Sequence, residues 1–165
     1  MKVIFLDFDG VLNWHGFLSG IRPVNGSGEL DYAAMLDPSR VALLNQICEQ
    51  TGAVVVVSST WCRMHRNANL RGFLKSRGFA GKMIGSTPKL ERTSPERVLS
   101  EEISVQRGEE IAAWINERPG DISRFVILDD DSDMAHLSRF LVQTSMETGL
   151  QPDHVTQAVA ILEGK

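Results

Sequence analysis

The chain has 165 residues, of which 42% are hydrophobic and 23% charged, and its net charge at neutral pH is −4. This balance predicts one globular domain over residues 1–165 and argues against a protein that coats nucleic acid. No apolar run approaches the ~20 residues of a membrane span, no signal peptide is evident, and the two cysteines show no metal or redox spacing, so we expect a reducing, cytoplasmic setting.

The first elements predicted along the chain are a buried strand, an irregular flap and a helix. Residues 3–6 form an unbroken apolar run, as in a parallel-sheet strand that is buried on both faces. Residues 13–37 are rich in glycine and polar groups, and they predict an irregular flap that is too short for a folded cap domain. Asp37-Pro38 then starts a helix with Asp37 as its N-cap, and Gly52 ends it.

The remainder of the chain alternates between strand and helix patterns. Apolar runs predict further strands at 53–57, 82–85, 125–128 and 140–142. Helices are predicted over about 64–77, from Ser94-Pro95-Glu96, from a cap at Ser104 to Pro119-Gly120, and over 155–162. This alternation indicates an α/β fold in which helices cover both faces of a parallel sheet.

Oxygen-bearing side chains follow directly after three of the predicted strands. The first strand ends in Asp7-Phe-Asp9-Gly10, the second in Ser58-Ser59-Thr60, and the fourth in Asp129-Asp130. Ligands of open α/β sheets bind beyond these carboxyl ends of the strands. Ionised carboxylates at a buried strand end need a cation, and oxygen ligands suit Mg²⁺. A simple Asx-type turn after the first strand is the alternative interpretation.

These residues predict the hydrolysis of a phosphomonoester with the help of Mg²⁺. Asp7, at the end of the strand, would attack phosphorus and form an aspartyl-phosphate. Asp9 would protonate the leaving oxygen and then activate water. Asp129 and Asp130 would complete the metal shell around Asp7 and Asp9, and Ser58 would hydrogen-bond the phosphoryl group.

A cation from the protein is also expected, because negative charge spreads over the phosphoryl oxygens. We favour Arg107, because a positive charge in the first turn of a helix opposes the helix dipole and so hints at function. Lys89, just after the third strand, is the rival candidate. Ser59, Thr60 and Arg63 follow the second strand and are further candidates for substrate binding, together with Lys89.

Taken in this order, the motifs resemble those of the haloacid dehalogenase-like (HAD) phosphatases. The resemblance is carried by Asp7-Phe-Asp9-Gly10-Val, by the strand ending in Ser58, by a basic residue ahead of a helix, and by the strand ending in Asp129-Asp130. It implies a three-layer Rossmann-like sheet of order 3-2-1-4-5 with little or no cap domain. It also implies Mg²⁺ held by Asp7, the backbone carbonyl of Asp9 and an aspartate of the fourth strand.

A closer resemblance is to the phosphatase domain of bacteriophage polynucleotide kinase-phosphatase and to HAD domains of RNA-repair proteins. It is carried by residues 107–114 ahead of 126–130, and it implies removal of a 3′-phosphate from an RNA or DNA end. Arginine here replaces the usual lysine of the third motif, and Asp131 and Asp133 add acids that leave the metal ligands open. The Gly-x-x-x-x-Gly-Lys-Ser/Thr motif of the kinase half is absent. No obligate protein partner and no membrane are implied.

Residues 61–82 give weak support to a nucleic-acid substrate. The segment contains no acid and six basic residues: Arg63, Arg66, Arg71, Lys75, Arg77 and Lys82. It predicts either a contact with a phosphate backbone or a solvated amphipathic helix. Trp14 and Trp61, near two strand ends, are candidates for stacking on a base or for packing in the protein.

Three other functions remain as hypotheses. The first is a HAD phosphatase of small metabolites or nucleotides. The second is a two-metal nuclease that uses Asp7, Asp9, Asp129 and Asp130 without a covalent step. The third is a non-catalytic binding module, which the intact carboxylates disfavour. A response-regulator receiver would need an aspartate at the end of the third strand, and residues 82–88 contain none.

Overall fold

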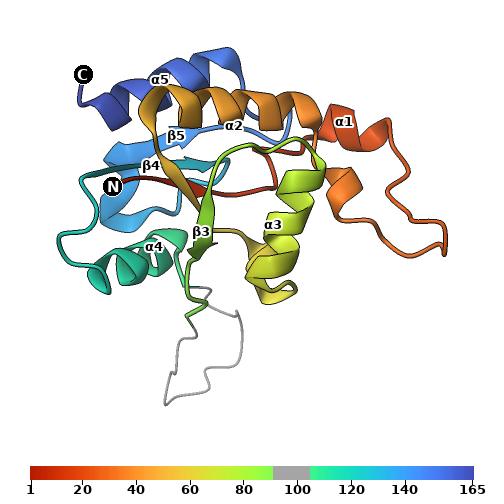
Figure 1. The fold of residues 1–165 in the computed structure, drawn as a ribbon, viewed down its shortest axis with the longest axis horizontal. Coiled ribbons are helices and arrows are strands. Elements are labelled where there is room, and N and C mark those ends of the chain that lie inside the picture. Colours follow the sequence, from red (N-terminus) through yellow and green to blue (C-terminus); the bar gives the residue numbers. More distant parts are fainter. Residues whose placement is uncertain (91–104) are drawn as a thin grey trace.

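A computed structural model, which describes residues 1–90 and 105–165, shows a parallel sheet between two layers of helices (Figure 1). The sheet has the strand order β3-β2-β1-β4-β5, and its paired strands are all parallel. The strands are β1 (Lys2–Leu6), β2 (Val54–Val57), β3 (Met83–Ser86), β4 (Arg124–Asp129) and β5 (Leu141–Gln143). The predicted α/β fold and strand order are therefore confirmed.

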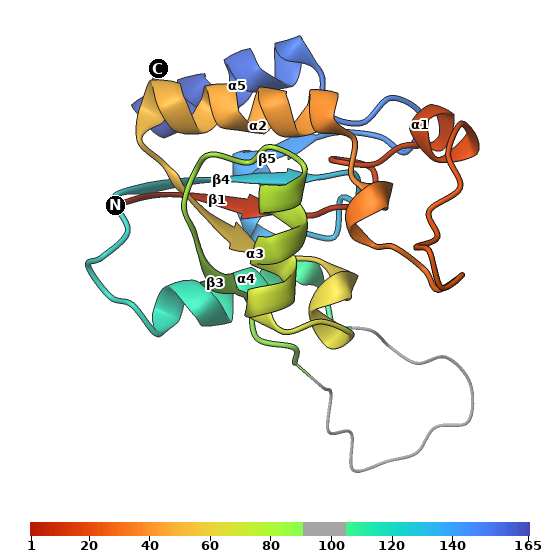
Figure 2. The ribbon, with the colours of Figure 1, turned by 45° about the vertical axis from the view of Figure 1, so that its right-hand side comes forward.

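Strand β1 lies at the centre of the sheet, which explains its unbroken apolar sequence. Its residues 3–6 are fully buried, because helices cover both faces. Ile4 and Leu6 face the layer of α2 (Pro38–Thr51), α3 (Asn67–Ser76) and α5 (Pro152–Glu163). Val3 and Phe5 face the layer of α4 (Arg107–Asn116) and the 3₁₀ helix η3 (Ala135–Phe140). Figure 2 shows α2 and α5 side by side on one side of the sheet and α4 on the other.

The predicted boundaries of the first long helix are confirmed. The Asp37 side chain accepts a hydrogen bond from the backbone N–H of Ser39 at 2.8 Å, and Pro38 is the first helical residue. Gly52 ends α2 in the left-handed region, with φ of 68°. The sequence rules for N-caps and C-caps are sufficient here, because both signals are local.

The flap is more ordered than predicted. Residues 13–37 contain helix α1 (His15–Ser19), the 3₁₀ helix η1 (Ala33–Met35) and an antiparallel bridge between Val24 and Leu30. Neither helix has a side-chain cap, so the sequence carries no local signal for them. The part of residues 13–37 that folds as helix is thus limited to these two short segments.

Several predicted boundaries need correction. The helix predicted from about residue 64 starts at Asn67, because the 3₁₀ helix η2 (Thr60–Arg63) precedes it and Arg66 is extended. The last helix starts at Pro152 rather than 155, where Gln151 and His154 form a capping box. Strand β5 begins and ends one residue later than the predicted range of 140–142. The short helix predicted from Ser94 and the predicted cap Ser104 lie outside the described residues. None of the helices in the described residues is long and apolar enough to span a membrane.

A close contact between α4 and the segment before η3 generates a stability prediction. A Cβ atom on Gly108 would lie 2.1 Å from the backbone oxygen of Met134, whereas nothing lies within 4 Å of one on Gly72 in α3. We expect Gly108→Ala to lower the free energy of unfolding by about 1–3 kcal/mol through overpacking. The matched control Gly72→Ala should raise it by about 0.4–1 kcal/mol. Urea denaturation measures both, and equal effects of the two substitutions would contradict the contact.

Candidate active site

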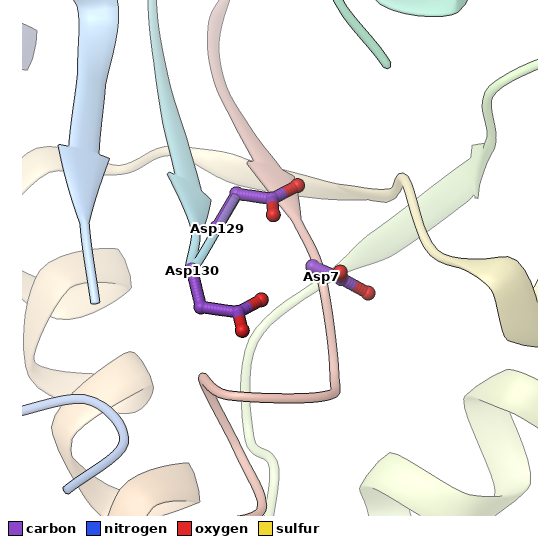
Figure 3. Close-up of side chains that lie close together, drawn as sticks. All are labelled: Asp7, Asp129 and Asp130. Carbon is purple, nitrogen blue, oxygen red and sulfur yellow. The ribbon is translucent and has the colours of Figure 1, made fainter. Parts of the chain in front are cut away.

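Three carboxylates meet where the central strands end (Figure 3). Because β1 and β4 are neighbours in the sheet, their carboxyl ends bring Asp7 beside Asp129 and Asp130. One oxygen from each of the three lies within 4.8 Å of the others. Asp7 is 5% exposed and Asp129 is 1% exposed, so two of the three acids are buried. The prediction that the ends of these two strands converge is therefore confirmed.

Gly10 makes room for the third carboxylate. Its backbone has φ of 66°, and a Cβ atom at this position would lie 2.4 Å from Cγ of Asp130. Any other residue would be strained in this conformation and would displace the Asp130 side chain. The glycine of the Asp7-Phe-Asp9-Gly10 motif is thus explained by the packing of the acids.

Arg107 is the basic residue that reaches the carboxylates. Its Nη2 atom lies 3.4 Å from Oδ2 of Asp7, and its Nε atom lies 3.6 Å from Oδ2 of Asp129. Its backbone N–H donates to Oδ2 of Asp133 at 2.9 Å, so an acid from the loop after β4 caps the start of α4. These acids offset the unfavourable position of Arg107 at the positive end of the helix dipole.

Lys89, the rival candidate, is held elsewhere. Its Nζ atom lies 2.8 Å from Oε2 of Glu110, which is 3% exposed. The other carboxylate oxygen of Glu110 accepts a hydrogen bond from the backbone N–H of Leu90 at 3.3 Å. This ion pair ties the segment after β3 to the first turn of α4. Of the two candidates, the structure therefore places Arg107, and not Lys89, against Asp7.

Burial and mutual repulsion favour the protonated forms of the two buried acids. Desolvation, opposed mainly by Arg107, raises the pKa of Asp7 to about 6. Desolvation and the charge of Asp7 raise the pKa of Asp129 to about 8. Burial by itself would lower the pKa of Arg107, but the charges of Asp7 and Asp129 raise it. One guanidinium thus compensates only part of the negative charge, and the cluster requires a further cation or protons.

The donor set fits a hard divalent cation such as Mg²⁺. All candidate ligands are carboxylate oxygens, as this ion prefers. Oδ2 of Asp129 is buried and has no hydrogen-bond partner among the described residues, and Nε of Arg107 approaches it only to 3.6 Å, so this oxygen has room for a cation ligand. Asp131 is exposed and Asp133 caps α4, so neither joins the cluster. The residues positioned to hold the ion are Asp7, Asp129 and Asp130.

The carboxylate of Asp9, which was also predicted to bind the metal, is not one of the three that converge, and both of its oxygens accept hydrogen bonds. Nδ2 of Asn13 donates to Oδ1 at 2.7 Å, and Nε1 of Trp61 donates to Oδ2 at 3.0 Å. Oδ1 of Asn13 in turn accepts from the backbone N–H of Gly10 at 3.2 Å. The Asp9 carboxylate is therefore held in one orientation by two donors that sequence reasoning did not identify, since neither belongs to a motif.

The two tryptophans proposed for base stacking have other contacts. Trp61 is 3% exposed and packs edge-on against Phe8, so the prediction that it stacks on a base is wrong. Nε1 of Trp14 donates to Oδ2 of Asp37 at 2.8 Å, and Arg40 lies over the Trp14 ring at 5.1 Å. For both residues, packing within the protein is the interpretation that the structure favours.

The hydroxyl residues after β2 divide into buried and exposed groups. Ser58 is 1% exposed, and its Oγ accepts a hydrogen bond from Oγ1 of Thr87 at 3.4 Å. Ser59 is fully buried, its Oγ accepts a hydrogen bond from the backbone N–H of Trp61 at 3.3 Å, and its side chain favours the ionised form of Asp7 by lowering the pKa of that carboxyl. Thr60 and Arg63 lie on η2 and are exposed. Thr87 was missed because nothing in the sequence after β3 marks it.

Comparison with known families agrees with the geometry. Residues 3–155 match the family model described as the HAD domain in Swiss Army Knife RNA repair proteins. The chain belongs to this family. The resemblance to HAD domains of RNA-repair proteins is confirmed, and the family indicates a HAD-type phosphatase with a phosphorylated substrate. No curated protein and no solved structure matches the chain.

The raised pKa values of the cluster predict how stability depends on pH without metal. Because the pKa values of Asp7 and Asp129 in the folded protein exceed 3.8, the folded state binds more protons than the unfolded chain between that value and about 8. Their contribution to stability is therefore fully present below pH 3.8 and is lost as pH rises through about 6 and about 8. Added Mg²⁺ should restore stability at the alkaline end.

Substitution of Asp129 by Asn checks this prediction. In urea denaturation with EDTA, Asp129→Asn should make the fall in stability with rising pH shallower, because one of the two raised carboxyls is gone. The matched control is Asp131→Asn, which removes an exposed acid of the same loop and should keep the wild-type slope. A wild-type slope in Asp129→Asn would contradict the assignment.

Proposed function

We propose that this HAD-type phosphatase hydrolyses phosphomonoesters with Mg²⁺ through a phosphorylated Asp7. The observation that carries the proposal is the position of Asp7 directly after β1, where Nη2 of Arg107 lies 3.4 Å from its carboxylate and oxygens of Asp129 and Asp130 lie within 4.8 Å. Mg²⁺ bound at these carboxylates would neutralise their charge and that of the phosphoryl oxygens, which keeps Asp7 ionised as a nucleophile.

The chain's own residues divide the reaction into two steps. In the first, an oxygen of Asp7 forms a bond to phosphorus, the ester P–O bond breaks, and Asp9 gives its proton to the leaving oxygen. In the second, Asp9 takes a proton from water, the water oxygen bonds to phosphorus, and the bond to Asp7 breaks, releasing inorganic phosphate. Arg107, already aimed at Asp7, would orient the phosphoryl oxygens in both steps.

We further propose that the phosphate occupies the 3′ end of a nucleic-acid strand. The RNA-repair proteins in which this domain family occurs support that substrate class. Phosphatase action on small metabolites or nucleotides is the competing outcome. A two-metal nuclease is less well supported, because the carboxylate of Asp9 is directed to Asn13 and Trp61 instead of to the other acids.

Replacement of the nucleophile gives the most direct test. Asp7→Asn should lower phosphate release from p-nitrophenyl phosphate and from a 3′-phosphorylated oligonucleotide by about three orders of magnitude or more. Asp131→Asn, with its exposed side chain, should keep near wild-type activity. Wild-type protein in EDTA should lose activity as well, and added Mg²⁺ should recover it. Full activity of Asp7→Asn would overturn the covalent mechanism.

Removal of the Trp61 donor tests the role of Asp9. Trp61→Phe keeps an aromatic ring in the core but loses the N–H that holds Asp9. General acid catalysis is worth roughly 10²–10⁴-fold, and a poor leaving group needs it most. We therefore expect kcat for a 3′-phosphorylated oligonucleotide to fall about tenfold more than kcat for p-nitrophenyl phosphate, whose leaving group departs without a proton.

Trp114→Phe is the matched control, because Trp114 is equally buried but packs against Phe5 in the opposite layer. It should affect both substrates alike. If Trp61→Phe lowers kcat equally for the two leaving groups, its contact with Asp9 has no part in proton transfer.

A further inference from the structure

A polar groove opens beside the site at the start of α3. Residues 62–67 and Ser86 line this groove, whose volume is about 520 Å³. Arg63 and Arg66 are exposed, and among the described residues neither forms an ion pair. No acid occurs between positions 61 and 82, although the whole chain carries a net charge of −4. The groove therefore concentrates positive charge on an otherwise acidic protein.

The groove adjoins the candidate active site through the ends of two strands. Ser86 is paired with Val57, the residue directly before Ser58. The thiol of Cys62 contacts the backbone oxygen of Val57 at 3.7 Å. Val57 is in turn paired with Leu6, the residue directly before Asp7, so one end of the groove lies near the strand ends that carry the candidate active site.

One residue of the groove lining, His65, is packed among aromatic side chains. The ring of His65 packs edge-on against Tyr32, with centroids 4.2 Å apart, and against Phe73, with centroids 5.1 Å apart. Tyr32 also packs against Trp61, which holds Asp9. This aromatic cluster packs η2 and His65, which lies between the two arginines, against Tyr32 and against α3.

We propose that this groove binds the phosphodiester backbone of the strand whose terminal phosphate reaches Asp7. Guanidinium groups recognise phosphate oxygens in a bidentate manner, and none of the described residues that line the groove carries a carboxylate. The inference rests on the proposed function, and it makes the protein a phosphatase of polymer ends. Arg63 and Arg66 are substrate-binding residues that contact the chain next to the terminal nucleotide.

The test compares a polymer with a small substrate. The double substitution Arg63→Gln and Arg66→Gln should raise KM for a 3′-phosphorylated decanucleotide about tenfold or more at low salt and leave kcat unchanged. KM for p-nitrophenyl phosphate and for a 3′-phosphorylated mononucleoside should not change. Because each lost phosphate contact lowers the slope of log affinity against log salt by about one, the slope for the decanucleotide should fall by about two.

A matched double substitution removes the same charge at the other end of the strands. Arg124 starts β4 and Arg139 precedes β5, so Arg124→Gln with Arg139→Gln should leave KM for the decanucleotide at the wild-type value. The groove proposal is overturned if this control weakens decanucleotide binding as much as the groove variant does. It is also overturned if the groove variant raises KM equally for the mononucleoside, or if a phosphopeptide, and not the decanucleotide, shows the dependence on Arg63 and Arg66.

Failure of the proposed function has a different signature. In that case the wild-type protein releases phosphate from none of the three phosphomonoesters. Fluorescence anisotropy with a labelled decanucleotide that ends in a 3′-hydroxyl then tests the groove by itself. Weaker binding by the Arg63→Gln, Arg66→Gln protein than by the control variant supports the groove, and equal binding by both variants rejects it.

Discussion

Repulsion among three carboxylates at the end of the sheet is the constraint on which the site depends. Two unit charges at the 4.8 Å limit of this cluster repel by roughly 3 kcal/mol at an effective dielectric constant of about 20. Arg107 faces Asp7 and Asp129, but one positive charge does not balance three negative ones. Such an arrangement is costly in the protein alone, and the divalent cation that we propose would relieve the repulsion.

Two glycines allow these charged groups to approach one another. Gly10 leaves space for the Asp130 side chain, and Gly108 lets the first turn of α4 rest against the backbone of Met134. The second contact brings Arg107 within reach of Asp129, since the helix could not lie so close with a Cβ at this position. The site therefore depends on missing side chains as much as on the charged ones.

Sequence reasoning succeeded where the signals were local or followed from the topology. The apolar runs of β1, β2 and β4 predicted buried strands, and parallel pairing of neighbouring strands then placed Asp7 beside Asp129 without any coordinates. The preference for Arg107 over Lys89 rested only on the position of Arg107 in the first turn of a helix, because both are basic residues near a strand or helix end. Only the partners of each, Asp7 for one and Glu110 for the other, separate them.

The contacts of Asp9 and the position of Trp61 could not be predicted from the sequence for a related reason. Asn13 follows Asp9 closely but belongs to no recognised motif, and Trp61 comes from the segment after β2 and meets Asp9 only in the folded chain. The short helices of the flap lack caps, so no local pattern marked them either. Hydrophobic periodicity reports burial and period, but it does not report which polar groups face each other across a fold.

The N-terminal cap of α4 connects Arg107 with the loop that follows β4. Asp133 and Met134, which hold the start of this helix, belong to the same loop that supplies Asp130 just after β4. Arg107 is therefore anchored to the loop that carries Asp130 and Asp133, whereas Asp7 directly follows β1. The loop after β4 thus fixes the start of α4, and with it Arg107, whereas the pairing of β1 with β4 fixes Asp7 relative to Asp129.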